Sequence, residues 1–137
     1  DDHRGLRDIV EVRITLDNAL TEPVTQAWKN RQDPELDQIV EQMDLRAQKG
    51  ELFTDQDRRF HMRLLEPLDN HLFLHLTEAF WAVHTLTVPL LDGPRPEDML
   101  SAAKAHRRML QAARAGDAQA YRQATAQHYA PLLATLT

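Results

Sequence analysis

Residues 53–65 read FTDQDRRFHMRLL, and they are the clearest sign that this chain is helical. Their large apolar residues recur at the spacing of an amphipathic helix and share one face: Phe53, Phe60, Leu64, Leu65 and, just beyond, Leu68. Asp57 and His61 stand four residues apart inside this apolar face, not on the charged side. A buried carboxylate is costly unless it is paired or bound to a cation, so this pair of residues needs an explanation.

The composition indicates a helical protein of one domain. The chain has 137 residues, 42% apolar and 27% charged, a length that suits a single domain over residues 1–137. Its abundant Ala, Leu, Gln, Glu and Arg favour helix. The net charge of -5 argues against this chain gripping a phosphate backbone by itself. The lack of cysteine excludes disulfides and thiolate metal sites and fits a cytoplasmic location. No apolar run approaches the ~20 residues of a membrane span.

Helix start and stop signals divide the chain into segments. Six helices are expected, at about 6–28, 33–50, 54–70, 71–88, 96–115 and 117–136. Asp33, followed by a proline, is a typical N-cap, and Thr54 is expected to cap the third helix. Gly116 is a typical residue for the end of the fifth.

Proline and apolar runs add detail to this pattern. Pro23 is expected to bend or interrupt the first helix. The nearly apolar run LFLHLTEAFWAV, residues 72–83, is expected at the centre of the molecule. The stretch PLLDGPRPED, residues 89–98, is expected to be a loop. Because the connections are short, the sequence predicts an all-α antiparallel bundle.

His106 and His128 repeat the oddity of His61 on the last two helices, since each lies among apolar residues. Any one of them alone is more often a satisfied core histidine, and Asp57 with His61 alone would be explained by a hydrogen bond or a half-exposed edge. Three histidines and an aspartate from three helices instead predict a single metal site, because a bundle can bring inward side chains to one point. One oxygen and three nitrogens suit Zn, Ni, Mn or Fe, with Zn or Ni favoured, and do not suit Ca or Mg.

A cationic residue also lies on an apolar face. Arg13 falls within the apolar stripe of the first helix. A buried guanidinium needs an anion. That anion is either Asp17 or Glu11 in an internal salt bridge, or the carboxylate of a ligand beside the metal. His84, on the fourth helix, could reach the same pocket.

Three stretches together resemble a known family. EVRITLDNALTEPVTQAW (11–28), DQDRRFHMRLLEPLDN (55–70) and AHRRMLQAARAGDAQAYRQATAQHY (105–129) resemble the E-x-R-x-x-L-E opening, the D-x-x-F-H helix and the His-containing ending of the FCD domain. This is the ligand-sensing C-terminal domain of FadR-type GntR transcription regulators. The joint pattern is specific, because the D-x3-H pair is followed by a histidine 45 residues later and another 22 further on.

The resemblance implies a site and an assembly. Metal-binding members use an Asp and a His on one helix and single His residues on two later helices, and these positions fall on Asp57, His61, His106 and His128. The arginine of the E-x-R motif, which in related regulators helps to hold a carboxylate effector, falls on Arg13. The family fold is an antiparallel bundle of six to seven helices around a central metal and effector pocket. Members act as homodimers joined to an N-terminal winged helix-turn-helix domain, which we expect in a longer parent protein.

Three functions are compatible with these residues. A sensory domain would bind a small organic acid at the metal, with Arg13 and His84 at the effector, and would change the affinity of a fused domain for DNA by linkage. A helical metalloenzyme would use the same Asp and three His to activate water. A metal-free interaction module would use the histidines as core residues. We favour the sensory domain of a transcription regulator, which is not an enzyme and has no membrane partner.

Overall fold

The computed structural model describes residues 4–87 and 95–136. Within them it contains helices and no strand: α1 (Arg4–Trp28), α2 (Pro34–Gln48), α3 (Thr54–Leu65), the short 3-10 helix η1 (Glu66–Leu68), α4 (His71–Thr87), α5 (Pro96–Ala115) and α6 (Ala118–Leu136). The predicted all-α class is confirmed. The expected end of the fourth helix at residue 88 and most of the expected loop lie outside the described residues. None of the described helices is both long and apolar enough to cross a bilayer.

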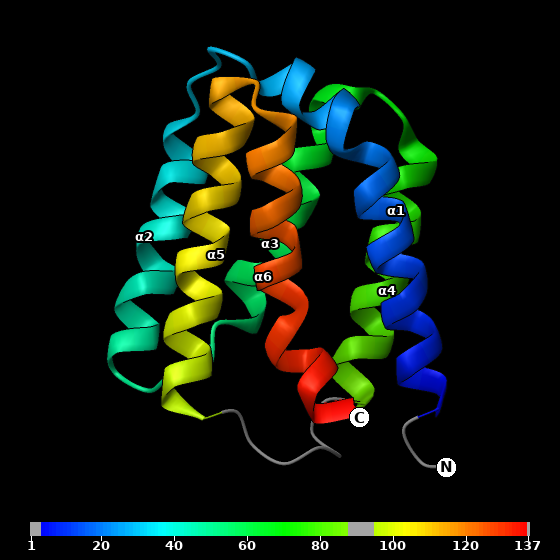
Figure 1. Ribbon diagram of the computed structural model, residues 1–137, viewed down its shortest axis with the longest axis vertical. Coiled ribbons are helices and arrows are strands. Elements are labelled where there is room, and N and C mark those ends of the chain that lie inside the picture. The colour runs from blue at the N-terminus through cyan, green and yellow to red at the C-terminus, as the bar shows by residue number, and fades with distance from the viewer. Residues whose placement is uncertain (1–3, 88–94, 137) are drawn as a thin grey trace.

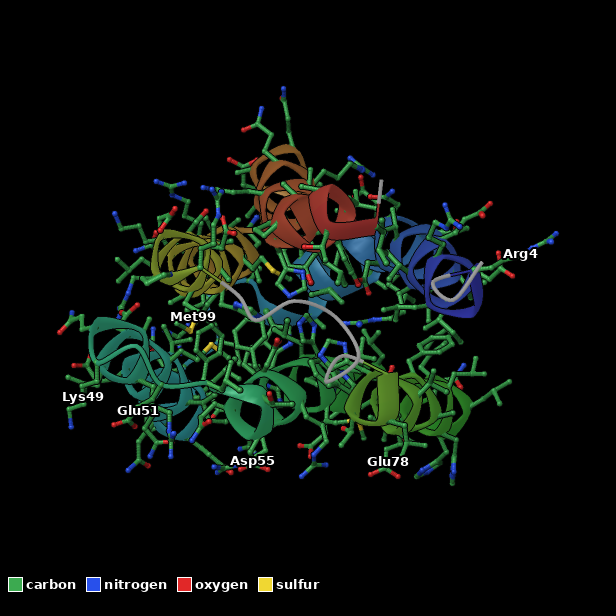
Figure 2. All side chains as sticks on the ribbon, turned by 90° about the horizontal axis from the view of Figure 1, so that it is seen from below. Arg4, Lys49, Glu51, Asp55, Glu78 and Met99 are labelled. Carbon is green, nitrogen blue, oxygen red and sulfur yellow. The ribbon has the colours of Figure 1, made fainter. Side chains whose placement is uncertain are left out.

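The helices form an antiparallel bundle of two layers. Successive helices run in opposite directions, from α1 rising beside the N-terminus to α6 descending to the C-terminus (Figure 1). Seen from below, α2, α3 and α4 make one layer and α5, α6 and α1 the other, with charged groups around the outside (Figure 2). The space between the layers is therefore enclosed by all six helices, and inward side chains from different helices meet there.

Local capping explains where several helices begin and end. Asp33 accepts hydrogen bonds from two backbone amides of the first turn of α2, at 3.1 and 3.3 Å. Gly116 follows α5 with φ of 67°, a left-handed conformation that favours glycine, and a Cβ there would lie 2.9 Å from Cδ of Lys29. The expected cap at Thr54 is wrong, because α3 begins at that residue and Phe53 occupies the cap position without a side-chain hydrogen bond.

The hydrophobic core packs the end of α1 against α3, close to the polar residues that lie between the two layers. Trp28 is 1% exposed, and its indole nitrogen donates to the backbone oxygen of Leu64 at 2.9 Å. Helix α1 runs without a break through Pro23, and its last turns lean across the top of the bundle (Figure 1), so the proline bends the helix and does not interrupt it. A smaller apolar cluster packs the start of α1 against the end of α6.

The expectation that the fourth helix is central is wrong for the isolated chain. Helix α4 lies at the edge of its layer, with Glu78 at the periphery in Figure 2. On its inner face Phe80 and Trp81 are buried, whereas on its outer face Leu72 is 63% and Leu86 is 77% exposed. The helix is apolar on both faces, and residues 4–87 and 95–136 cover only one of them. A helix that is apolar all round is ordinarily buried, so the outer face of α4 is a surface that calls for a partner.

Candidate metal and ligand site

The four residues predicted as metal ligands meet between the layers. Helix α3 carries Asp57 and His61 one turn apart, α5 carries His106, and α6 carries His128. Each offers one possible ligand atom, and these atoms all lie within 4.8 Å of one another. The apolar stripe of each helix turns its polar residue inward along with its hydrophobic neighbours, and for that reason the bundle brings these four side chains together.

The aspartate lies nearest to all three histidines. Oδ1 of Asp57 is 2.7 Å from Nε2 of His106, 3.1 Å from Nε2 of His61 and 3.7 Å from Nε2 of His128. The Nε2 atoms of His61 and His128 are 3.2 Å apart. The cluster is therefore one carboxylate oxygen facing three imidazole nitrogens.

Backbone and ring contacts orient His106. Its side chain is 0% exposed, and Nδ1 lies 2.7 Å from the backbone oxygen of Ala102 one turn earlier. Since that carbonyl can only accept, Nδ1 donates, and Nε2 is left to face Asp57. The ring of Phe60 meets the His106 ring edge-on at a centroid distance of 5.0 Å. A hydrogen bond to the second ring nitrogen is the usual way in which proteins orient a metal-binding histidine.

The electrostatics favour an ionised carboxylate at Asp57 and a neutral ring at His128. Burial alone would raise the pKa of Asp57, but the charge of His106 and hydrogen bonds from all three histidines hold that pKa well below its ordinary value. Burial, together with the charge of His106, lowers the pKa of His128 to about 3. An ionised carboxylate and unprotonated imidazole are the forms that bind metal ions.

The donor set fits a transition-metal ion. Ligand atoms that share an ion at ~2.0–2.2 Å lie about 3 Å apart when they are adjacent. The three distances from Oδ1 of Asp57 range from 2.7 to 3.7 Å, the Nε2 atoms of His61 and His128 are 3.2 Å apart, and all four possible ligand atoms lie within 4.8 Å of one another. Nδ1 of His128 is buried without a hydrogen-bond partner among the described residues, so only its Nε2 has polar neighbours, and these belong to the cluster. Three nitrogens and one oxygen match Zn, Ni, Mn or Fe, whereas Ca and Mg prefer oxygen ligands.

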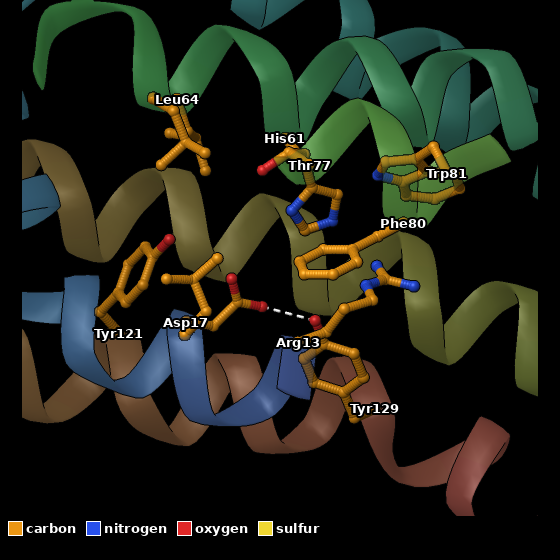
Figure 3. A pocket seen from close by; sticks show the side chains of 11 residues that line it. Arg13, Asp17, His61, Leu64, Thr77, Phe80, Trp81, Tyr121 and Tyr129 are labelled. Atoms are coloured by element: carbon orange, nitrogen blue, oxygen red, sulfur yellow. Dashed lines mark hydrogen bonds between the residues drawn. The ribbon is translucent and has the colours of Figure 1, made fainter. Parts of the chain in front are cut away.

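A small cavity adjoins the cluster, and His61 belongs to both. Its volume is about 20 Å³, enough for about one water molecule. The polar part of its lining comes from α1, α3, α4 and α6: Arg13, Asp17, His61, Thr77, Tyr121 and Tyr129 (Figure 3). An organic ligand would therefore need the surrounding side chains to move apart.

Arg13, predicted to hold the carboxylate of an effector, lines this cavity, and its neighbours there are aromatic. It is 5% exposed, and its guanidinium carbon lies 4.9 Å from the ring centre of Trp81 and 5.4 Å from that of Tyr129. The internal salt bridge to Asp17 or Glu11 is not formed, and Arg13 has no ion pair within residues 4–87 and 95–136. Its charge is stabilised by the two ring faces and remains available to an anion.

His84 lies beside the cavity and does not line it. Its ring contacts that of Trp81 at a centroid distance of 4.7 Å. Burial and, next, the charge of Arg13 lower the pKa of His84 to about 4. The ring is therefore neutral near pH 7 and close to Arg13.

The sequence alone did not identify Trp81 and Tyr129, the two aromatic residues that contact Arg13 in this cavity. Tyr129 donates its hydroxyl hydrogen to Asp17 at 2.5 Å, and its ring lies under Arg13. Trp81 belongs to an apolar run that reads as ordinary core. The one available signal was position: Tyr129 follows a predicted ligand, and Asp17 follows Arg13 by one helical turn.

Two comparisons with known proteins bear on this site. The FCD domain family matches residues 8–131, a range that contains the four cluster residues and Arg13. A protein of Micromonospora viridifaciens, named "Putative transcriptional regulatory protein NedR", is 45% identical over 98 residues, which make up 72% of this chain and 70% of that protein. No solved structure matches significantly. Because the family model matches residues 8–131 of the 137, the chain belongs to the FCD domain family.

Proposed function

We propose that this chain is a single ligand-sensing domain of a transcription regulator, in which a divalent transition metal, Zn or Ni by preference, and a small organic acid bind side by side. One observation carries the proposal: the potential ligand atoms of Asp57, His61, His106 and His128 lie within 4.8 Å of one another, next to a cavity that Arg13 lines. Family membership and a relative named as a transcriptional regulator support the regulatory role.

The chain's own residues divide the work of binding. The cluster would hold the metal, which supplies positive charge and open coordination positions for an acid. Arg13, supported by Trp81 and Tyr129, neutralises the carboxylate of that acid. His84, kept neutral by burial, adds a polar group near Arg13 without a further charge.

Coupling to DNA follows from where the site lies. Its residues belong to α1, α3, α4, α5 and α6, so a bound acid contacts or draws together helices from both layers. A ligand that prefers one packing of these helices shifts the population toward it. A DNA-binding domain joined to this one in a longer protein would change its affinity for DNA by the same coupling free energy. This role places the protein in the cytoplasm.

A second copy of the chain is the partner that suits the outer face of α4. Five apolar residues of this helix recur at alternating steps of four and three, the spacing of a helix-pairing stripe: Leu72, Leu76, Ala79, Val83 and Leu86. We call them the α4 stripe. Leu72, Leu76 and Leu86 are 63%, 38% and 77% exposed.

The α4 stripe is nearly symmetric about its middle, which favours pairing with itself. In an antiparallel crossing centred on Ala79, Leu72 faces Leu86 of the partner subunit and Leu76 faces Val83 of the partner subunit. The small alanine at the centre lets the two helices approach closely, with larger residues on either side. A two-fold axis needs this kind of self-complementary surface.

Metal analysis tests the sensor directly. Purified wild-type protein and the His75→Ala variant, which removes an exposed histidine of α4, should retain metal close to one ion per chain. His106→Ala and His128→Ala should not, because each removes one of four ligands. Equal metal content in all four proteins would refute the site.

Ligand binding tests the rest of the proposal. Small carboxylates should raise the melting temperature of the metal-loaded wild type more than that of Arg13→Met, which keeps a side chain of similar length without the charge. The metalloenzyme alternative would use the same ligands. Turnover of a small acid by the metal-loaded protein would favour that alternative over the sensor.

A further inference from the structure

We propose that the outer surface of α4 carries a second metal site, in which His71 and His75 together bind one divalent transition-metal ion. The site shares no residue with the cluster between the layers, so the inference goes beyond the proposed function and does not depend on it. Because the two side chains are exposed, we expect weaker binding than at the cluster. Such an ion would be lost during purification, which leaves the metal content expected of the purified protein unchanged.

The helix places the two histidines for joint binding. They stand four residues apart at the start of α4, so their side chains leave one face of the helix a turn apart. Residues at this spacing have Cβ atoms about 5–6 Å apart, a separation that two imidazole rings can bridge through one ion. A pair of histidines four residues apart on one helix is also how the H-E-x-x-H motif of metalloproteases binds zinc.

The first turn of α4 is held in place, so the pair does not lie on a fraying end. Oδ1 of Asn70 accepts hydrogen bonds from the backbone amides of Leu72 and Phe73, at 3.0 and 3.4 Å. An asparagine that accepts from the first amides of a helix is a typical N-cap. The chain therefore orders this backbone by itself, and a bound ion has to order only the two rings.

Neither histidine has a competing partner. Both side chains are exposed, and among the described residues neither forms a hydrogen bond, an ion pair or a ring contact. The histidines of the cluster differ, because Asp57 already lies close to all three of them. A neutral imidazole without a partner keeps a ring nitrogen free to bind a metal ion, and binding breaks no existing contact.

A carboxylate lies on the same side of α4. Glu78 follows His75 by three residues and His71 by seven, so it shares their face of the helix, and its side chain is 60% exposed. It points away from the bundle (Figure 2), and its Oε1 lies 3.9 Å from Nη1 of Arg58, an exposed ion pair that contributes little. Glu78 can therefore turn toward an ion that the histidines hold. Two nitrogens and one oxygen suit Zn, Ni or Cu.

The site stays open if a second copy of the chain covers the α4 stripe. At 3.6 residues per turn, the middle of the group formed by His71, His75 and Glu78 lies about a quarter of a turn from the middle of the stripe. It lies on the opposite side of the stripe from Phe80 and Trp81, which line the cavity. Helix α4 therefore has three sides: one that lines the cavity, one that suits a partner and one that suits an ion.

Zinc titration of the chelator-treated chain, followed by calorimetry, tests the site. The wild type should bind zinc in two steps, a tight one at the cluster and a weaker one on α4. His71→Ala and His75→Ala should each keep the tight step and lose the weaker one, because a single ring binds an ion less tightly than a pair by about a hundredfold or more. His106→Ala should do the reverse. Glu78→Gln should weaken only the second step, and by a smaller factor.

The NMR signals of the imidazole rings identify the ligands independently of affinity. Those of His71 and His75 should shift together during the weaker step, and those of His128 during the tight step. Binding of a single ion to the wild type, with no shift at His71 or His75, would overturn this inference and leave the sensor intact. A weaker step that survives in both alanine variants would overturn it as well. A wild type that shows only the step sensitive to His71→Ala would uphold this inference and refute the metal site of the sensor.

Discussion

Replacing Asp57 by asparagine is the sharpest test of the cluster. The change keeps the size and shape of the side chain but removes the negative charge that lies 2.7 Å from His106 and 3.1 Å from His61. We expect Asp57→Asn to lose most of the metal-dependent stabilisation, because the only anion of the cluster disappears and the amide oxygen that remains is a neutral, weaker ligand. The quantity to compare is the shift in melting temperature that added Zn or Ni produces in each protein.

The size of that shift can be worked out for a chain of this length. An unfolding entropy of about 2.1 cal/mol/K per residue gives about 290 cal/mol/K for 137 residues. An ion present at 100 times its dissociation constant stabilises the fold by about 2.7 kcal/mol, or about 9 °C. Mutating a residue that hydrogen-bonds to a metal ligand typically weakens metal binding about 10- to 100-fold. Changing a ligand itself should therefore weaken metal binding by at least about 100-fold. The same ion concentration then contributes about 0.4 kcal/mol, or about 1.4 °C.

The measurement is thermal unfolding followed by circular dichroism, on chelator-treated protein with and without metal. Each variant serves as its own reference, so any loss of stability in the metal-free state cancels. The matched control is Asp55→Asn, the same change two residues earlier on α3, where the carboxylate points outward and pairs with Arg58 at 3.6 Å (Figure 2). If Asp57→Asn keeps the wild-type metal shift, the cluster does not bind metal through Asp57 and the reasoning fails.

Three further predictions concern the metal-free fold and the assembly. The free energy of unfolding should fall as the pH drops from about 6.5 toward 3. In the folded protein the pKa of His128 is lowered to about 3, so its ring stays neutral over this range, whereas in the unfolded chain it takes up a proton. Urea unfolding at pH 7 and at pH 5 measures the loss. Gly116→Ala should cost about 1–2 kcal/mol in the same assay because φ is 67° there, while Gly5→Ala, in open space on α1, should not destabilise. Leu76→Asp should turn a dimer into a monomer in light scattering, whereas Leu52→Asp, 60% exposed and off the α4 stripe, should leave it a dimer; a Leu76→Asp dimer would exclude this surface.

Much of the fold could be predicted because its signals are local. The capping by Asp33 and the left-handed Gly116 follow from the chemistry of single residues, and the structure confirms both. The inward direction of His106 follows from the apolar residues around it on the helix, and it is 0% exposed. Periodicity reports which way a side chain points, and for the cluster that was enough, because all four residues point to the space between the layers.

The rest depends on contacts between distant segments, which periodicity does not report. The sequence shows that Arg13 points inward, but it does not show that Trp81 and Tyr129 are its neighbours, 68 and 116 residues further along the chain. The expectation that α4 lies at the centre of the molecule was wrong for a related reason. An apolar helix has to be covered, but composition alone does not say whether its own chain or another one covers it.

The meeting of His61 with His128, 67 residues apart in the chain, has a kinetic consequence. An ion shared by these two rings would act as a cross-link between α3 and α6, so α6 could not separate from α3 by local unfolding while the ion remained bound. Extraction of the metal by a chelator would then proceed only as fast as the bundle opens locally, and amide hydrogen exchange along α6 should slow in step with metal loading.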